Sequence, residues 1–369
     1  MSFSAESWLV HAGGSAEPGD PVAPPLVLAS IFSSQGEPGP GYGYGREGNP
    51  TWAALEAALG GLEQAEAVLF ASGQAASMAL MLALAKGRSR VVLAADGYFG
   101  ARVLADRLRP HGAEPIPVDQ QDLAAVKDAL AGAPALLWAE TPTNPLLRVA
   151  DLDRLGELAS AAGAPMIVDN TVATALLQRP LDWGAAASLY SLTKASSGHS
   201  DVILGAVVSR DAGLLAEVRS WRSSGGGIAG PVEAWLGLRG LKTLPLRIER
   251  QSRNAQAIAE HLAGQPKVRA VHYPGLLTGP ARAVADAQMP AGFGPLLSFD
   301  VGSAAAADAV IAAAALIVPA TSLGGVESSW ERRARWPAET APEGLIRLSA
   351  GIEVAADLIA DVDSALGVL

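Results

Sequence analysis

Short apolar runs alternate with longer Ala- and Leu-rich stretches between about residues 60 and 211. The apolar runs predict buried strands at residues 67–70, 91–94, 135–139, 166–168, 188–190 and 204–208. Helical stretches are expected between several of them, at residues 74–85, 122–130 and 151–162. Continuous apolar strands separated by helices are typical of a mostly parallel sheet covered on both faces. The pattern therefore predicts an α/β fold.

The flanking regions have different patterns. The first 45 residues are rich in Gly, Pro and Ser and show no clear periodicity, which predicts an extended arm. Asn49 and Pro50 supply an N-cap and a first-turn proline for a helix over 51–59, which is expected to end at Gly60 and Gly61.

After Pro231 one long helix is expected to run to about residue 263. A second, smaller α/β unit follows it, with strands at 268–272, 295–301 and 345–348 and helices at 304–315 and 354–366. We therefore expect an arm over 1–45, a large domain over 46–231 and a small domain over 232–369.

Composition removes several classes of protein. The 27 Lys and Arg residues against 37 Asp and Glu residues give a net charge of −10, which argues against a nucleic-acid partner. Cysteine is absent, which excludes disulfides, thiolate catalysis and Cys-ligated metal, and we expect no metal site. The chain shows neither a signal-peptide pattern nor the roughly 20 apolar residues that a membrane span needs. A cytoplasmic protein without a membrane partner is therefore expected.

Polar residues gather where the predicted strands end. In parallel sheets, ligands bind beyond the carboxyl ends of the strands. After the strand at 67–70, residues 71–76 (ASGQAA) form a small-residue turn that opens a helix, where free N–H groups favour a phosphate. This signal is weak alone, and the turn lacks the dinucleotide-binding fingerprint that a Rossmann oxidoreductase would carry. Asp169 follows another strand, where it could bind a ligand or cap the next turn.

Lys194 is the unusual residue of this set. It comes just after the strand at 188–190, and it alone among the five lysines has that position. Either it is an exposed loop residue, or its surroundings lower its pKa so that the neutral amine can form a Schiff base. A phosphate cradle, an aspartate and a lysine at neighbouring strand ends are the groups that pyridoxal 5′-phosphate (PLP) requires. Asn144 lies in a loop held by two prolines, which suits either a rigid turn or a residue held over a site.

With these motifs in place, the chain resembles the Cys/Met-metabolism PLP enzymes, a family that includes cystathionine γ-lyase, cystathionine γ-synthase and methionine γ-lyase. The resemblance covers nearly the whole chain and rests on the segments 44–51 (YGREGNPT), 140–147 (ETPTNPLL), 169–171 (DNT), 191–201, 239–244 (RGLKTL), 273–276 (YPGL), 322–328 (SLGGVES) and 347–353 (RLSAGIE). It implies fold type I, the aspartate-aminotransferase-like fold, with a large domain built on a mostly parallel sheet and a smaller C-terminal α/β domain.

The resemblance also implies residue roles. Lys194 would carry PLP and move protons, Asp169 would pair with the pyridine nitrogen, and Tyr98 would stack on the ring and act as an acid or base. The remaining cofactor contacts would come from Gly73, Gln74, Thr171, Ser191 and Thr193, with Tyr44 and Arg46 reaching the phosphate of a neighbouring subunit. The substrate would be held by Arg347 on its α-carboxylate, assisted by Asn144 and Ser322. The arm over 1–45 would then contact that neighbour, in a dimer of active dimers, a homotetramer.

Several residues depart from the family pattern. Tyr98 is followed by Phe99, Gly100 and Ala101 in place of G-G-T. Thr321 stands where cystathionine-specific members usually have Glu, and residues 332–336 (RRARW) replace the usual M-T-H segment. These departures alter the distal substrate pocket and leave the cofactor site intact.

The expected activity is therefore that of a PLP-dependent carbon–sulfur lyase. We expect γ-elimination on cystathionine to give cysteine, 2-oxobutanoate and ammonia. The alternatives are γ-replacement on an O-acylhomoserine, as in cystathionine γ-synthase, and a methionine γ-lyase-like activity. A PLP-binding homologue without turnover is the alternative outside the enzymes.

Overall fold

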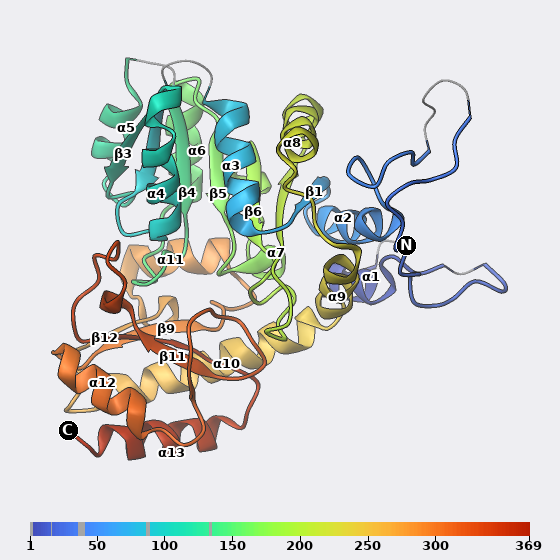
Figure 1. Cartoon of the computed structure of the whole chain (residues 1–369). Coiled ribbons are helices and arrows are strands. Elements are labelled where there is room, and N and C mark those ends of the chain that lie inside the picture. The colour runs from blue at the N-terminus through green and yellow to red at the C-terminus, as the bar shows by residue number, and fades with distance from the viewer. Residues whose placement is uncertain (1–2, 16, 36–40, 86–88, 133–134) are drawn as a thin grey trace.

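The computed structural model describes residues 3–15, 17–35, 41–85, 89–132 and 135–369. Two sheets organise these residues, one above the other in Figure 1. The larger sheet has the strand order β1-β7-β6-β5-β4-β2-β3. Its strands are β1 (Glu66–Phe70), β2 (Ser89–Ala94), β3 (Ala113–Val118), β4 (Ala135–Glu140), β5 (Met166–Asp169), β6 (Ala187–Ser191) and β7 (Gly205–Ser209). Only β7 runs antiparallel to its neighbours, so the expected α/β fold with a mostly parallel sheet is confirmed.

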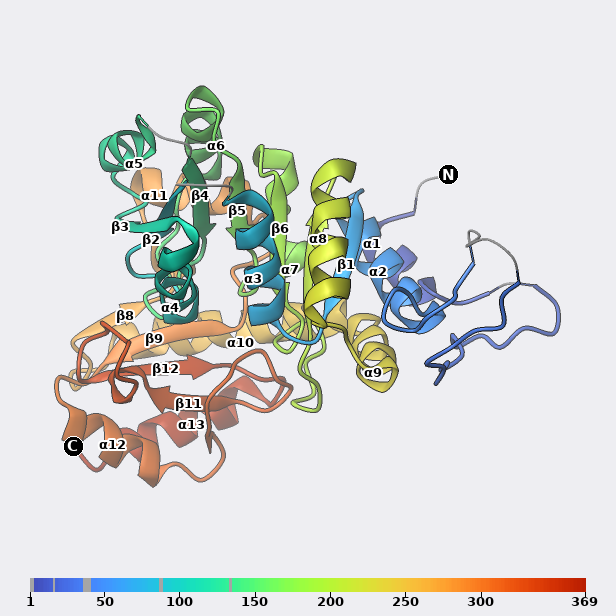
Figure 2. The ribbon, with the colours of Figure 1, turned by 45° about the horizontal axis from the view of Figure 1, so that its top comes forward.

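Helices cover both faces of this sheet (Figure 2). They are α2 (Pro50–Leu62), α3 (Gly73–Leu84), α4 (Phe99–Arg107), α5 (Leu123–Leu130), α6 (Leu152–Ala161), α7 (Thr174–Leu177) and α8 (Ala212–Gly225). Successive residues of β2 show why the strands are apolar throughout. Val91 and Leu93 pack with residues of α3 and α4, whereas Val92 packs with residues of α5 and α6. Both faces of such a strand are therefore buried over residues 91–94.

One strand of this sheet was not predicted from the sequence. β3 contains Pro115 and Pro117, and proline cannot donate to a strand ladder. The strand is tolerated because it lies at the edge of the sheet and pairs only with β2. α2 also extends beyond its predicted end at Gly60 and Gly61, to Leu62.

The second sheet has the order β10-β11-β12-β9-β8. Its strands are β8 (Ala270–His272), β9 (Leu296–Asp300), β10 (Val318–Pro319), β11 (Ser329–Arg332) and β12 (Leu345–Ser349), and its neighbouring helices are α11 (Gly279–Gln288), α12 (Ala304–Ala313) and α13 (Ala355–Leu366). β10 and β11 were not expected from the sequence, because both are short and β11 carries charged residues.

The long helix predicted after Pro231 is two helices, α9 (Pro231–Leu241) and α10 (Leu244–Ala263). The prediction was wrong because Pro245 has no backbone N–H to continue a helix and instead occupies the first turn of α10. The prediction of an arm without periodicity was also wrong in part. α1 (Ala5–His11) is a short helix capped by Ser4, and its Leu9 is fully buried. The predicted domain boundaries at residues 45 and 231 stay predictions.

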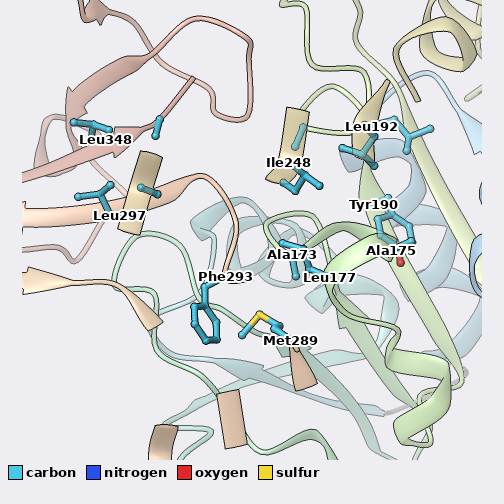
Figure 3. Packing of buried hydrophobic residues seen from close by; sticks show 14 of the residues in the cluster. Ala173, Ala175, Leu177, Tyr190, Leu192, Ile248, Met289, Phe293, Leu297 and Leu348 are labelled. Carbon is cyan, nitrogen blue, oxygen red and sulfur yellow. The ribbon is translucent and has the colours of Figure 1, made fainter. Parts of the chain in front are cut away.

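One hydrophobic cluster joins the two sheets (Figure 3). Tyr190 and Leu192 enter it from β6 and the turn that follows, Ile248 enters from α10, and Leu297 and Leu348 enter from the second sheet. The two sheets therefore share a core, and the carboxyl ends of the parallel strands are held against the second sheet.

Candidate active site

Lys194 lies in the turn that follows β6, where the two sheets meet. Its Nζ donates a hydrogen bond to Ser322 Oγ at 2.8 Å. Burial is the main cause that lowers the pKa of Lys194 from its usual 10.5 to about 8, and the positive charges of Arg347 and Arg333 act in the same direction. Of the two interpretations of Lys194, the structure therefore supports a lysine whose surroundings lower its pKa, not an exposed loop residue.

Asp169 ends the neighbouring strand β5. It lies directly opposite Leu189 of β6 on one side and Glu140 of β4 on the other. Its Oδ1 accepts a hydrogen bond from the Thr171 N–H at 3.1 Å, and Thr171 Oγ1 in turn accepts from the Ser191 N–H at 2.9 Å. Burial raises the pKa of Asp169, opposed by Thr171 and by the charge of Lys194. A cation placed against this buried carboxyl would stabilise its ionised form.

The amino terminus of α3 lies against the end of β6. A Cβ atom on Gly73 would come within 3.0 Å of the Ser191 Cβ, and one on Gly205 would come within 2.6 Å of the Gly73 nitrogen. Only glycine permits this approach of backbones. Gln74, next in the helix, donates to the Gly100 carbonyl at 3.2 Å. The first N–H groups of a 12-residue helix therefore lie beside the Ser191 hydroxyl, which is suitable for an anion.

Thr193 connects the turn that carries Lys194 to the segment just before β7. Its hydroxyl donates to the Leu204 carbonyl at 3.1 Å and accepts from the Leu204 N–H at 3.0 Å. Arg247 of α10 holds the other side of the turn, donating to the carbonyls of Ala195 at 2.6 Å and Ser196 at 3.1 Å. The backbone that carries Lys194 is thus fixed on both sides.

Tyr98 precedes α4, and a buried carboxyl holds its backbone. Glu140 accepts from the Tyr98 N–H at 2.7 Å and from the Asn144 N–H at 2.7 Å. Burial raises the pKa of the Tyr98 phenol. A Cβ at Gly100 would lie 2.4 Å from the Tyr98 ring, so glycine at this position makes room for the ring.

Arg347, on β12, connects the second sheet to this site. Its side chain is 4% exposed; Nη1 donates to Asn144 Oδ1 at 3.0 Å, and Nη2 donates to the Ser322 carbonyl at 2.7 Å. Burial is the main cause that lowers the pKa of Arg347 to about 10. The three residues predicted to bind substrate therefore lie together, and Ser322 also contacts Lys194.

The loop that carries Ser322 packs directly on the lysine turn. Gly324 has a φ of +77°, and a Cβ there would lie 2.4 Å from the Ala195 nitrogen. A cavity of about 250 Å³ opens beside this loop, and its lining includes Thr193, Thr321, Ser322 and Glu327. It is large enough to receive a side chain beyond the substrate α-carbon.

Tyr44 and Arg46 lie elsewhere in the single chain. Tyr44 lies at the end of the arm and Arg46 directly after it, and the arm extends away from both sheets in Figures 1 and 2. The Arg46 guanidinium lies 5.2 Å from the centre of the Tyr44 ring and donates to the Ser223 carbonyl at 2.8 Å. The fold of one chain thus does not bring these two residues to Lys194.

Three buried charged residues at the site were not recognised from the sequence as site residues. They are Glu140, Arg247 and Glu331. Glu140 ends an apolar strand, and Glu331 lies in β11 directly opposite Arg347. A charged residue at the end of an otherwise apolar run is the signal that could have marked Glu140, because an unpaired charge is costly to bury. Glu331 lies among polar and charged residues and gives no such signal.

The residues present fit PLP. A helix amino terminus with adjacent hydroxyls suits the phosphate, and a buried carboxyl that forms no ion pair with a described residue suits a protonated ring nitrogen. An amine whose pKa is lowered to about 8 suits imine formation. Among the described residues, no group of His, Asp and Glu side chains is arranged to hold a metal ion, and no helix is long and apolar enough to cross a membrane.

Comparisons with known proteins agree with this chemistry. The model of the Cys/Met metabolism PLP-dependent enzyme family matches residues 6–367. A putative cystathionine γ-lyase of Streptomyces coelicolor is 45% identical over 94% of this chain and 89% of its own. A cystathionine γ-synthase of Mycobacterium tuberculosis is 42% identical over 97% of this chain and 95% of its own. The crystal structure of an apo methionine γ-lyase from Micromonospora echinospora has a TM-score of 0.92, with 42% identity and 99% of each chain covered.

The fold and the site define a PLP-dependent enzyme of fold type I. More narrowly, the chain belongs to the Cys/Met metabolism PLP-dependent enzyme family, and its cofactor is PLP. The resemblance found in the sequence motifs is thereby confirmed, and an enzyme acting on an amino acid is established. The similar proteins carry three different reaction names, so the family membership leaves the reaction open.

Proposed function

We propose that this enzyme catalyses γ-elimination on cystathionine, in which water is consumed and cysteine, 2-oxobutanoate and ammonia are released. The observation that carries the proposal is the contact between Lys194 and Ser322, which joins a low-pKa amine to the loop that also contacts Arg347. An amine poised near neutral pH can both accept and donate a proton. Similarity to the Streptomyces protein named as a putative cystathionine γ-lyase supports the choice of elimination.

The geometry of the site supports the following proposed cofactor contacts. Lys194 would hold PLP covalently, Asp169 would pair with the ring nitrogen and Tyr98 would stack on the ring. The other contacts would be made by Gly73, Gln74, Thr171, Ser191 and Thr193. When bound, PLP supplies an electron-withdrawing ring that acidifies the substrate α-carbon.

The proposed substrate contacts lie on the other side. Arg347 would bind the α-carboxylate with help from Asn144 and Ser322, since a guanidinium matches a carboxylate geometrically. Lys194 would take the proton from Cα. γ-Elimination also removes a proton from Cβ, and Cγ and the departing cysteine sulfur each gain one, so an amine with a pKa of about 8 would serve to carry protons between these atoms. The cavity beside Thr321 and Glu327 would receive the γ-substituent.

We further propose a homo-oligomer in which Tyr44 and Arg46 serve a neighbouring subunit, in a dimer of active dimers located in the cytoplasm. The arm supports this proposal because Leu28 and Ile31 expose 71% and 73% of their area in the single chain. Apolar side chains gathered on an extended arm suit an interface.

A second candidate is γ-replacement, which the 42% identity to a cystathionine γ-synthase favours. Incubation of the holoenzyme with cystathionine alone separates the two reactions. Elimination predicts 2-oxobutanoate without any added thiol. If no 2-oxobutanoate forms from cystathionine or from another γ-substituted amino acid, whereas an O-acylhomoserine and cysteine yield cystathionine, elimination is rejected.

A further inference from the structure

The segment after β11 places an unusual number of donors on one buried carboxylate. The Glu331 side chain is only 2% exposed. Its Oε1 accepts from Arg333 at 2.7 Å and from Thr321 Oγ1 at 3.1 Å, and its Oε2 accepts from Trp336 Nε1 at 3.1 Å. Arg335 lies 3.0 Å from Oε2. Three of the residues that replace M-T-H in this chain, Arg333, Arg335 and Trp336, therefore converge on a single anion.

Glu331 also contacts Arg347, the proposed clamp on the α-carboxylate of the substrate. Glu331 and Arg347 lie opposite each other in the β11–β12 pair, and Arg347 Nη2 donates to Glu331 Oε1 at 2.6 Å. Nη2 is occupied by this contact and by the Ser322 carbonyl, whereas Nη1 contacts Asn144. Glu331 thus holds the Nη2 end of the guanidinium, and the Nη1 end lies beside Asn144.

Buried charge in this cluster is balanced. Arg333 is 3% exposed and also donates to Glu339 at 2.8 Å, whose side chain is 1% exposed. The pairs Glu331–Arg347 and Arg333–Glu339 therefore compensate one another in a region where a lone charge would be costly. The Arg333 guanidinium lies 5.8 Å from the centre of the Phe99 ring. Phe99 directly follows Tyr98 in the chain, so the contacts of Arg333 extend from Glu331 to the proposed cofactor side of the site.

We propose that Glu331, braced by Arg333 and Trp336, is a positioning residue that fixes the Arg347 guanidinium for the α-carboxylate of the substrate. The inference rests on the proposed role of Arg347 as the carboxylate clamp. In this chain Arg333, Arg335 and Trp336 thus act on substrate binding through Glu331, without touching the substrate.

Two ligands of the holoenzyme separate carboxylate recognition from every other contact. L-alanine carries an α-carboxylate and no γ-leaving group, whereas L-alaninamide has the same amino group without the negative charge. Their dissociation constants are measured from the change that each causes in the visible absorbance of the holoenzyme. The ratio of the two constants reports on the clamp alone.

The variants are chosen by where each side chain points. Glu331→Gln keeps the shape and removes the charge, and the double variant Arg333→Met/Glu339→Gln removes the brace without leaving a lone buried carboxylate. Trp336→Phe removes one donor. Arg332→Met is the matched control, because Arg332 contacts Asp308 and Glu343 on the other side of β11. Arg347→Lys is the reference for the clamp itself.

We expect Glu331→Gln to weaken L-alanine binding by roughly tenfold and L-alaninamide binding by less than about twofold, since a charge-assisted hydrogen bond is lost. The double variant should follow in the same direction, Trp336→Phe should have a smaller effect, and Arg332→Met should change neither ligand. With a reactive substrate, KM should rise while kcat changes little. Retained cofactor absorbance shows that each variant is folded.

One result would contradict the proposed role of Arg347, and another would contradict only the proposed role of Glu331. If Arg347→Lys weakens both ligands equally, the clamp role in the proposed function fails. If Arg347→Lys discriminates between the ligands but Glu331→Gln does not, the clamp stands and the positioning role of Glu331 is wrong. An equal loss of affinity for both ligands in Glu331→Gln would mean that Glu331 supports the local structure and does not position Arg347.

Discussion

The cofactor side and the substrate side of this site are built in different ways. On the cofactor side, Asp169, Ser191 and Lys194 are placed by the ends of neighbouring strands and by turns whose backbones are hydrogen bonded. On the substrate side, Arg347 is held by the side chains of Asn144 and Glu331 and by the backbone carbonyl of Ser322. Backbone topology positions one half, and a network of buried ions positions the other.

This difference has a physical consequence. Backbone hydrogen bonds at strand ends are formed together with the sheet, so the cofactor side is as rigid as the fold. The ion network depends on exact charge balance, because removal of one partner leaves another buried and unpaired. Substitutions on the two sides should therefore affect different measurable quantities.

The largest effect is expected from Lys194→Ala. Without the amine, the covalent link to PLP and the proton transfers at Cα are both lost, so turnover should fall by roughly 10²–10⁴-fold or more. The visible absorbance of bound cofactor should vanish while far-ultraviolet circular dichroism is retained. Lys127→Ala, on an exposed face of α5, is the control and should keep both absorbance and activity. Persistent absorbance in Lys194→Ala would mean that another lysine holds PLP.

The next effect concerns stability. Leu297 lies opposite Leu348 in the second sheet and is fully buried in the cluster that joins the two sheets. Leu297→Ala should lower the free energy of unfolding by about 2–5 kcal/mol through lost burial and a cavity. Chemical denaturation of the holoenzyme measures this. Val354→Ala, at an exposed position, should change it little. An unchanged stability of Leu297→Ala would argue against a shared core.

Asp169→Asn tests the cofactor side without disturbing its shape. The substitution removes the carboxylate charge that would pair with the ring nitrogen, an interaction worth about 1.5–3 kcal/mol. We expect kcat to fall roughly 10- to 150-fold with the cofactor still bound, because electron withdrawal by the ring weakens. Single-turnover kinetics on cystathionine measures the step. Wild-type kcat in this variant would remove Asp169 from the mechanism.

The smallest effect is a shift in a pH profile. Neutral Lys194 is the reactive form, and a pKa of about 8 means that its reactive fraction rises as pH increases and levels off above about pH 8. The rate of PLP uptake by cofactor-free enzyme should follow this curve in stopped-flow absorbance. Arg347 lowers and Glu331 raises this pKa. Arg347→Met should therefore move the curve to higher pH, and Glu331→Gln to lower pH. If neither variant shifts the curve, the charges of Arg347 and Glu331 do not influence the pKa of Lys194.

The cofactor side could largely be predicted from the sequence for the reason just given. Parallel strands end at one edge, so Asp169 and Lys194 could be placed near each other from strand order alone. The substrate side could not, because its contacts join residues 144 and 322, which lie in loops, to residues 331 and 347 of a strand pair. Only the resemblance to a family suggested that Asn144, Ser322 and Arg347 belong together.

The elements of the fold likewise divide into those that local sequence predicts and those that depend on tertiary contacts. Apolar runs predicted the central strands, whereas β3 was missed because its prolines contradict a strand at any position except an edge. α1 was missed because its helix is supported by the burial of Leu9, a tertiary contact that leaves no local periodicity. Glu331 was missed for a related reason, since its charge is explained only by partners that a sequence does not place.

Gly324 limits how the enzyme can acquire a new substrate preference. Because its backbone packs on the lysine turn with no room for a Cβ, any other residue there would push the loop and the turn apart. Natural variation or laboratory evolution is therefore expected to leave this point unchanged and to act instead at Thr321 or in the charged stretch beyond β11. Libraries that randomise those positions should yield altered selectivity at a far higher frequency than libraries centred on the glycine.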